Sequence, residues 1–209
     1  MTRVTFLSKN PGLSGQYTVR FDNGTSMRLY RQTIEDFGLC PGREFSETEL
    51  SDLTEAAGKI SARMRAVRIV SSTSVSKKDL EQRLVRKGED PQQAREAVSW
   101  MSDLNLLDDR KTAEQIVYRC ISKGYGIKRA KQVLFEKRIP REIWDEVLEN
   151  YPDQMDQIED FLRTRLQNNP TDRETKKAID ALLRRGHSWS TIRQALRQYV
   201  QDADDYMEE

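Results

Sequence analysis

The chain has 209 residues, of which 36% are hydrophobic and 33% are charged, and its 35 basic and 34 acidic side chains nearly cancel. This composition predicts a protein with thin cores and a large charged surface. No run approaches the ~20 apolar residues that cross a bilayer, and residues 1–6 are too poor in apolar side chains for a signal peptide. We therefore expect a cytoplasmic protein.

The balanced total conceals a segregation of charge along the chain. Residues 1–57 carry 6 basic and 8 acidic side chains (net −2), residues 58–140 carry 19 and 10 (net +9), and residues 141–209 carry 10 and 16 (net −6). A basic segment of this size favours contact with a polyanion. A solvated helical surface is the alternative interpretation, and composition does not separate the two.

The N-terminal residues predict a small antiparallel sheet. Tyr17, Val19 and Phe21 alternate with a period of two, as in a strand with one buried face. Asp22-Asn23-Gly24 then supplies the turn of a hairpin, with residues 26–30 as its returning strand. We expect residues 1–57 to form a β-rich domain with a short helix around residues 33–37.

Ser46-Glu47-Thr48-Glu49 is a capping box that opens a helix. From about Ile60 the apolar period becomes 3.6, and we expect Ile60, Met64 and Val67 to line one helix of a first helical unit. The inner face of the next helix is predicted to hold Leu80, Leu84 and Val85. A third helix opens at Asp90-Pro91, which pairs an N-cap residue with a proline at the first helical position.

One stretch of sequence recurs three times. The copies are Leu84-Val85-Arg86-Lys87-Gly88, Leu134-Phe135-Glu136-Lys137-Arg138 and Leu182-Leu183-Arg184-Arg185-Gly186, and the first overlays the third at an offset of 98 residues. The middle copy fits at offsets of 49 to 50. A period near 50 residues predicts a tandem array of small helical units that stack because none buries its apolar face alone.

The sequence therefore predicts a mainly α-helical protein with three tandem three-helix repeats after the β-rich domain. The predicted domains are residues 1–57 (β-rich), 58–107 (repeat 1), 108–152 (repeat 2), 153–203 (repeat 3) and 204–209 (acidic tail).

No catalytic constellation is visible in the sequence. The single histidine, His187, follows Gly186 and is predicted to be a solvent-facing turn residue rather than a general base. Asp108 and Asp109 stand where a helix must begin, so we expect them to cap it rather than bind a metal. Gly124-Tyr125-Gly126 follows no strand and is predicted to end one helix and open the next. We predict a protein that is not an enzyme and has neither metal nor cofactor.

The two cysteines also lack the spacing of metal ligands. Cys120 lies on the apolar stripe of its helix, beside Ile116 and Val117. We therefore expect a buried structural thiol at Cys120.

Basic residues gather on the second helices of the first two repeats. A 100° step places Arg83 and Arg86 opposite Leu84, and Arg129 opposite Ala130. Stacked units would align these cations along one groove or edge, where they could contact a phosphate lattice or a protein–DNA filament. The alternative is that they only solvate the helices. The aligned cations are Lys77, Lys78, Arg83, Arg86, Lys87, Lys123, Lys128, Arg129 and Lys131.

Leu107-Asp108-Asp109, Lys123-Gly124-Tyr125-Gly126 and the run to Leu134 resemble the central signature of the RecX family, regulators of the bacterial RecA recombinase. Ser76-Lys77-Lys78-Asp79-Leu80 resembles its first repeat, and the likeness covers about residues 60–200.

The resemblance implies an elongated, curved array of three repeats that binds in the groove of the RecA filament on single-stranded DNA. It implies no enzymatic activity, and it adds Tyr125 to the cations as a candidate RecA- and DNA-binding residue. The chain departs from the family pattern at Ala130, where a larger aliphatic residue is usual, and at Arg138, which replaces the glycine seen at Gly88 and Gly186.

Our leading hypothesis is a monomeric regulator that binds the RecA filament and alters its assembly, ATPase activity and strand exchange in recombination and SOS-type repair. The alternatives are an autonomous nucleic-acid-binding module, using the Tyr125 turn and the lysines directly, and a helical scaffold whose charges serve only solvation.

Overall fold

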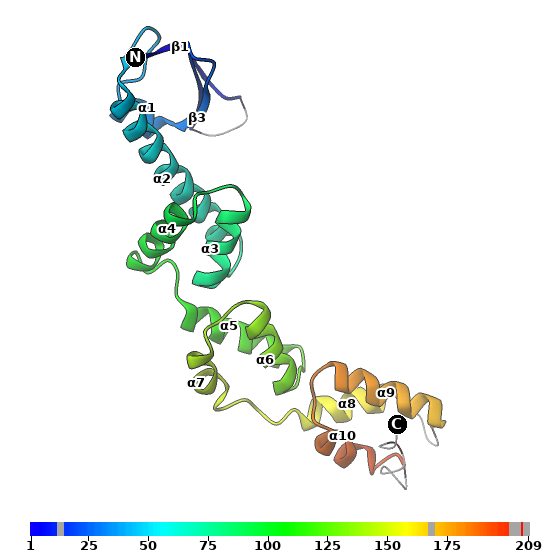
Figure 1. The fold of residues 1–209 in the computed structure, drawn as a ribbon. Coiled ribbons are helices and arrows are strands. Elements are labelled where there is room, and N and C mark those ends of the chain that lie inside the picture. Colours follow the sequence, from blue (N-terminus) through cyan, green and yellow to red (C-terminus); the bar gives the residue numbers. More distant parts are fainter. Residues whose placement is uncertain (12–14, 167–169, 201–205, 207–209) are drawn as a thin grey trace. The chain divides into compact units, whose positions relative to one another are not determined.

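The structure, a computed structural model, describes residues 1–11, 15–166, 170–200 and 206. It is mainly helical with a small antiparallel sheet at the N-terminus, which confirms the predicted fold class (Figure 1). The chain divides into two compact units, Met1–Leu107 and Asp108–Glu209. Of the predicted acidic tail, only Tyr206 lies within the described residues.

The sheet has the strand order β3-β2-β1-β4, and the paired strands are all antiparallel. Strand β1 (Thr2–Lys9) pairs with β2 (Gln16–Phe21) on one side and with β4 (Glu44–Phe45) on the other. Strand β2 forms the predicted hairpin with β3 (Ser26–Tyr30). The turn contains Gly24 at a φ of +82°, a conformation that glycine adopts without a Cβ penalty.

One face of the sheet is buried. Val19 and Phe21 are 0% and 3% exposed, as their alternation predicts, whereas Tyr17 is half-buried. Val19 and Phe21 belong to the same hydrophobic cluster as Leu53 and Ala57 of helix α2. The short helix α1 (Arg31–Asp36) lies next to β3 and α2, close to where the sequence predicts it.

Helix α2 (Glu47–Ser72) runs without interruption from the sheet into the first set of helices (Figure 1). The predicted capping box is present: the Ser46 hydroxyl accepts from the Glu49 amide at 3.2 Å, and the Glu49 carboxylate accepts from the Ser46 amide at 2.8 Å. The predicted boundary between residues 57 and 58 therefore falls inside one helix. The change of sequence pattern there marks a change of packing partner, from the sheet to helices α3 and α4.

The buried face of α2 also differs from the prediction. Ala62 and Ala66 are 0% exposed, whereas Met64 is 40% exposed and Val67 is half-buried. Small residues face the neighbouring helices where α2 packs against α4, and the end of the Gln93 side chain of α4 lies over Gly58 of α2. The expectation that Ile60, Met64 and Val67 line the helix was wrong for Met64, whereas Val67 packs against the first hydrophobic cluster and Ile60 is half-buried. The prediction missed the alanines, because it considered only large apolar residues.

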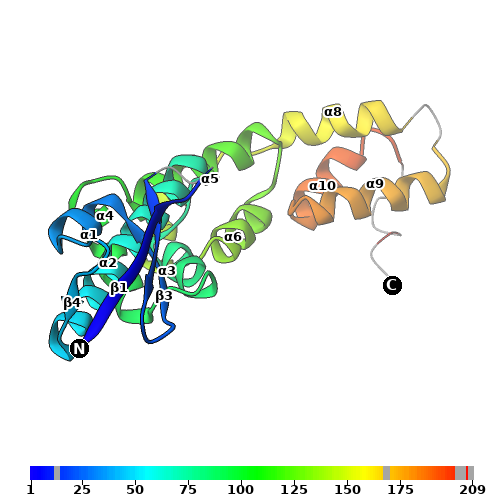
Figure 2. The same ribbon diagram turned by 90° about the horizontal axis from the view of Figure 1, so that it is seen from above.

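Helices α2 to α10 fall into three consecutive sets of three, which we call triplets (Figures 1 and 2). Each triplet has its own hydrophobic cluster. The first contains α2, α3 (Lys77–Arg86) and α4 (Pro91–Asp103). The others are α5 (Asp109–Ser122), α6 (Ile127–Glu136) and α7 (Trp144–Leu148), with a 3-10 turn Arg141–Ile143 before α7, and α8 (Met155–Arg165), α9 (Asp172–Arg184) and α10 (Trp189–Leu196).

The second helix of each triplet has a buried leucine as the third residue from its C-terminal end. Leu84 on α3, Leu134 on α6 and Leu182 on α9 are 0%, 0% and 1% exposed. In each case the leucine carbonyl accepts a hydrogen bond from the backbone amide five residues later. These amides belong to Glu89, Ile139 and His187, at 3.1, 3.0 and 3.2 Å.

A residue with positive φ ends each of these helices. Gly88, Arg138 and Gly186 have φ angles of +89°, +55° and +84°. Each amide also bonds back to the residue three positions earlier, as in a Schellman motif. Arg138 thus adopts the glycine conformation despite its Cβ, and the departure from the pattern changes the residue but not the turn.

Candidate functional site

Of the two aspartates that could suggest a metal pair, Asp108 is the N-cap of α5 and Asp109 is its first residue, 8% exposed. The Asp108 carboxylate caps α5, because it accepts hydrogen bonds from the amides of Arg110 at 2.9 Å and Lys111 at 3.1 Å. Across the described residues, no three His, Cys, Asp or Glu side chains gather as metal ligands would. None of the described helices is long and apolar enough to span a membrane.

The two cysteines have opposite environments. Cys120 is 3% exposed on the inner face of α5, as its position on the apolar stripe predicts, and burial raises the pKa of its thiol. Cys40 is exposed in the turn after α1.

His187 is buried, and its prediction as a solvent-facing turn residue was wrong. It is 5% exposed, and its ring Nε2 lies 3.0 Å from the carbonyl oxygen of Gly124. Burial lowers the pKa of the imidazole, although the bond to Gly124 opposes that effect. The neutral ring donates from Nε2 and joins the turn after α9 to the turn after α5.

The same two turns meet through glycines. The Gly126 amide donates to the Arg185 carbonyl at 2.9 Å. A Cβ added to Gly126 would lie 2.2 Å from the Gly186 carbonyl oxygen, and one added to Gly186 would lie 2.2 Å from the Arg129 amide nitrogen. Gly124-Tyr125-Gly126 ends α5 and opens α6, as predicted, and Gly126 also allows this backbone contact.

On α3, the structure separates the predicted cations into two kinds. Lys77, Lys78, Arg86 and Lys87 are exposed. Arg83 instead pairs with the buried Asp79 carboxylate at 2.9 Å and keeps only 30% of its side chain exposed. Because its charge is already partnered within the helix, Arg83 contributes to the fold more than to an external surface.

Val85 is exposed as well, although its prediction placed it on the inner face with Leu80 and Leu84. It is 38% exposed, while both leucines are fully buried. One step of 100° beyond Leu84 takes the side chain past the edge of the narrow buried face.

In the second unit, Lys123, Lys128 and Lys131 are exposed at the end of α5 and along α6. Arg129 pairs with Glu136 at 3.2 Å and is 32% exposed. Lys123 Nζ lies 5.9 Å from the centre of the Tyr125 ring, within reach of a cation–π contact.

The Tyr125 ring itself is half-buried against the core of its triplet. Its carbonyl accepts a 2.5 Å hydrogen bond from the Tyr151 hydroxyl, and burial raises the pKa of Tyr151 to about 12. The hydrogen bond from Tyr151 and the packing of the Tyr125 ring fix this turn on the core of the triplet. The exposed side chains next to the turn are those of Lys123 and Lys128.

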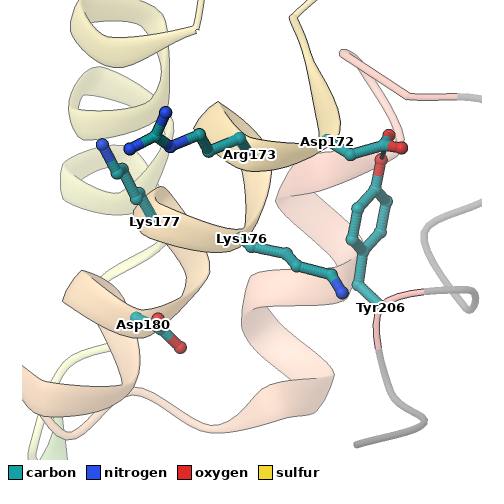
Figure 3. A pocket seen from close by; sticks show the side chains of 6 residues that line it. All are labelled: Asp172, Arg173, Lys176, Lys177, Asp180 and Tyr206. Atoms are coloured by element: carbon teal, nitrogen blue, oxygen red, sulfur yellow. Dashed lines mark hydrogen bonds between the residues drawn. The ribbon is translucent and has the colours of Figure 1, made fainter.

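Basic residues of α9 were missed by the sequence analysis, which followed only the first two repeats. A shallow surface pocket of about 510 Å³ lies on this helix (Figure 3). The Tyr206 hydroxyl donates to the Asp172 carboxylate at 2.8 Å at one end, and Lys176 extends toward Tyr206. The pocket is lined by Asp172, Arg173, Lys176, Lys177, Asp180 and Tyr206. The common spacing of Lys78, Lys128 and Lys176 in the three copies could have identified Lys176.

The chain is thus a mainly helical protein that exposes cations on the second helices of its triplets. No protein-family model matches the chain. It is 31% identical over 142 residues to the regulatory protein RecX of Chlorobaculum tepidum, covering 66% of this chain and 88% of that protein. It is 28% identical to RecX of Clostridium acetobutylicum over 204 residues, covering 93% of this chain and 95% of the relative. The chain belongs to the RecX family of regulatory proteins.

Solved structures share the fold. The crystal structure of a regulatory protein RecX matches with a TM-score of 0.60 at 20% identity, covering 91% of this chain and 97% of that chain. RecX from Lactobacillus salivarius matches with a TM-score of 0.59 at 21% identity, covering 69% of this chain and 97% of its own.

Proposed function

We propose that the protein is a regulator, not an enzyme, that binds the RecA filament on single-stranded DNA and modulates its assembly, ATPase activity and strand exchange. It acts as a cytoplasmic monomer in recombination and SOS-type repair and needs no cofactor. Exposed cations on α3 and α6 of a RecX-family chain carry this proposal. Asp108 and His187, which could otherwise suggest catalysis, form hydrogen bonds within the fold: Asp108 to the Arg110 amide and His187 to the Gly124 carbonyl. Their engagement supports a binding role rather than a catalytic one.

The physical basis is electrostatic. Single-stranded DNA in a filament is a regular lattice of phosphates, and lysines that approach it release condensed counterions. The exposed cations sit on rigid helices anchored by the buried Leu84 and Leu134. Rigid placement reduces the entropy lost on binding.

The direct test measures DNA-dependent ATP hydrolysis and strand exchange by RecA with increasing amounts of the protein. We expect a change in both rates at or below stoichiometric amounts, together with co-sedimentation of the protein with the filament. Unchanged rates and no co-sedimentation would contradict the proposal.

Charge reversal tests the surface. We expect Lys78→Glu, Arg86→Glu, Lys128→Glu and Lys131→Glu, combined, to weaken filament binding by at least tenfold, since all four residues are exposed. Arg83 and Arg129 are left unchanged because they hold ion pairs and keep only 30% and 32% of their side chains exposed. Lys78 pairs with Glu81 at 2.9 Å but keeps 58% of its side chain exposed. The matched control makes the same charge change at four exposed residues elsewhere: Lys9, Arg28, Arg95 and Arg197.

An autonomous nucleic-acid-binding module is the second candidate, favoured by Lys123 beside the Tyr125 ring. It requires tight, strongly salt-dependent binding to naked single-stranded DNA. Comparable loss of naked-DNA and filament binding in the charge-reversed variant would favour this module, whereas loss confined to the filament favours the regulator.

A further inference from the structure

The second helices of the triplets share an exposed pattern besides their buried leucine. The residue after that leucine is Val85 on α3, Phe135 on α6 and Leu183 on α9, and these are 38%, 63% and 44% exposed. None of the three packs against a core cluster of the described residues. Single exposed apolar residues are common, but the same position is apolar and exposed in all three triplets.

A lysine precedes each of these residues by seven positions. Lys78, Lys128 and Lys176 are all exposed. Residues seven apart lie on one face of an α-helix, two turns and about 10 Å apart along its axis. We call each such pair, with the helix face between them, the Lys–apolar stripe. It occurs once on each of α3, α6 and α9.

The surroundings of the stripes favour a protein partner over nucleic acid or membrane. Exposed arginines follow the apolar residue on α3 and α9, at Arg86 and Arg184, whereas Glu136 follows Phe135 on α6 and pairs there with Arg129. Val85 and Leu183 have no ring on which a base could stack. One exposed large apolar side chain on α3 and on α9, and two on α6, are also far less than the wide apolar face of a membrane-binding helix. A partner protein with an apolar pocket beside a carboxylate would complement an exposed apolar side chain and a lysine on one helix face.

We infer that the three Lys–apolar stripes dock on successive identical subunits of a protein polymer, each apolar side chain entering a pocket and each lysine pairing with a carboxylate. This rests on the proposed function, in which the polymer is the RecA filament. Three equivalent stripes on one chain suit a partner that repeats the same surface, since linked sites multiply affinity without any new kind of contact.

The test uses the full-length protein with Val85→Ser, Phe135→Ser and Leu183→Ser, singly and combined. Binding is measured by co-sedimentation with RecA filaments assembled on single-stranded DNA, and binding to naked single-stranded DNA is measured in parallel. We expect each single variant to lose about fivefold to tenfold in affinity, and the triple variant to lose about the product.

Two matched controls accompany these variants. Tyr118→Ser removes a residue of α5 that is 72% exposed and lies outside the stripes, and it should bind as the unmodified protein does. The combined variant Val85→Ile, Phe135→Leu and Leu183→Met keeps an apolar side chain at each position and should retain binding. Circular dichroism and melting temperature identify any variant that loses its fold.

Four outcomes overturn the inference. Full binding by the triple serine variant would do so while leaving the proposed function intact, whereas failure of the unmodified protein to bind the filament would end both. If only one of the three single variants lost affinity for the filament, a partner surface that repeats would be excluded. Equal loss of naked-DNA binding would show that the stripes contact nucleic acid instead.

Discussion

At the residue scale, His187 links pH to stability. Its pKa is lowered below the ordinary 6.5 because the ring is buried. As the pH falls, the imidazole therefore takes up a proton at a higher pH in the unfolded chain than in the folded protein. The stabilising contribution is complete above about pH 6.5 and is lost as pH falls below that value.

We expect His187→Gln to reduce the loss of thermal stability between pH 7.5 and pH 5.5, because glutamine can still donate to the Gly124 carbonyl but does not titrate in this range. Melting temperatures of the two proteins at both pH values check this. Parallel pH profiles would contradict it.

Alanine substitutions at Gly88 and Gly186, which occupy equivalent turns, distinguish the cost of backbone strain from the cost of a steric clash. An alanine at Gly88 meets nothing within 4 Å, so Gly88→Ala should cost only the left-handed backbone penalty, about 1–2 kcal/mol. Gly186→Ala adds a Cβ 2.2 Å from the Arg129 amide nitrogen. We expect its loss to exceed that of Gly88→Ala by at least about 1 kcal/mol in denaturant titrations. Equal losses would mean that the turns do not meet as described.

At the element scale, α2 depends on its first turn. Ser46→Ala removes the capping oxygen and should lower the free energy of unfolding by about 1 kcal/mol. Ser51→Ala, at an exposed position within the same helix, should change it by no more than about 0.5 kcal/mol. Urea unfolding of both variants measures the difference, and a similar effect of the two would argue against the cap.

Much of the helical architecture could be predicted from local sequence signals. Capping boxes, the recurring leucine and the turn chemistry act within a few residues, so Ser46, Leu134 and Gly88 could be placed from the sequence alone. The continuity of α2 could not, because a change of packing partner and the end of a helix both alter the apolar pattern.

The candidate site was predicted less completely for a similar reason. The burial of His187 depends on Gly124, 63 residues away, and no local pattern reports such a contact. Charge counts likewise do not distinguish Arg83, which is paired to a buried carboxylate, from Arg86, which is exposed. The exposure of Val85 depends on how narrow the buried face of α3 is.

At the scale of the whole molecule, the structure predicts where the chain can be divided. Met1–Leu107 contains the sheet, all of α2 and the first triplet, and Asp108–Glu209 contains the other two triplets. Each unit has its own hydrophobic clusters. We expect fragments 1–107 and 108–209 each to unfold cooperatively on heating, because neither loses part of a helix.

Division at residues 57/58 is the matched comparison. It cuts α2 between its sheet-facing and triplet-facing halves and removes the N-terminal cap from residues 58–107. We expect fragment 58–107 to show no cooperative melting by circular dichroism. Cooperative melting of this fragment would favour the boundary predicted from sequence.

The contrast between the two thiols makes the unmodified protein suitable for site-specific fluorescence. Maleimide reacts with the thiolate form of cysteine. Cys120 is shielded from solvent and burial raises the pKa of its thiol, whereas Cys40 is exposed to the reagent. One dye per chain should therefore attach beside the N-terminal sheet without any engineered cysteine. Its anisotropy would report association from a position well separated in sequence from α3, α6 and α9.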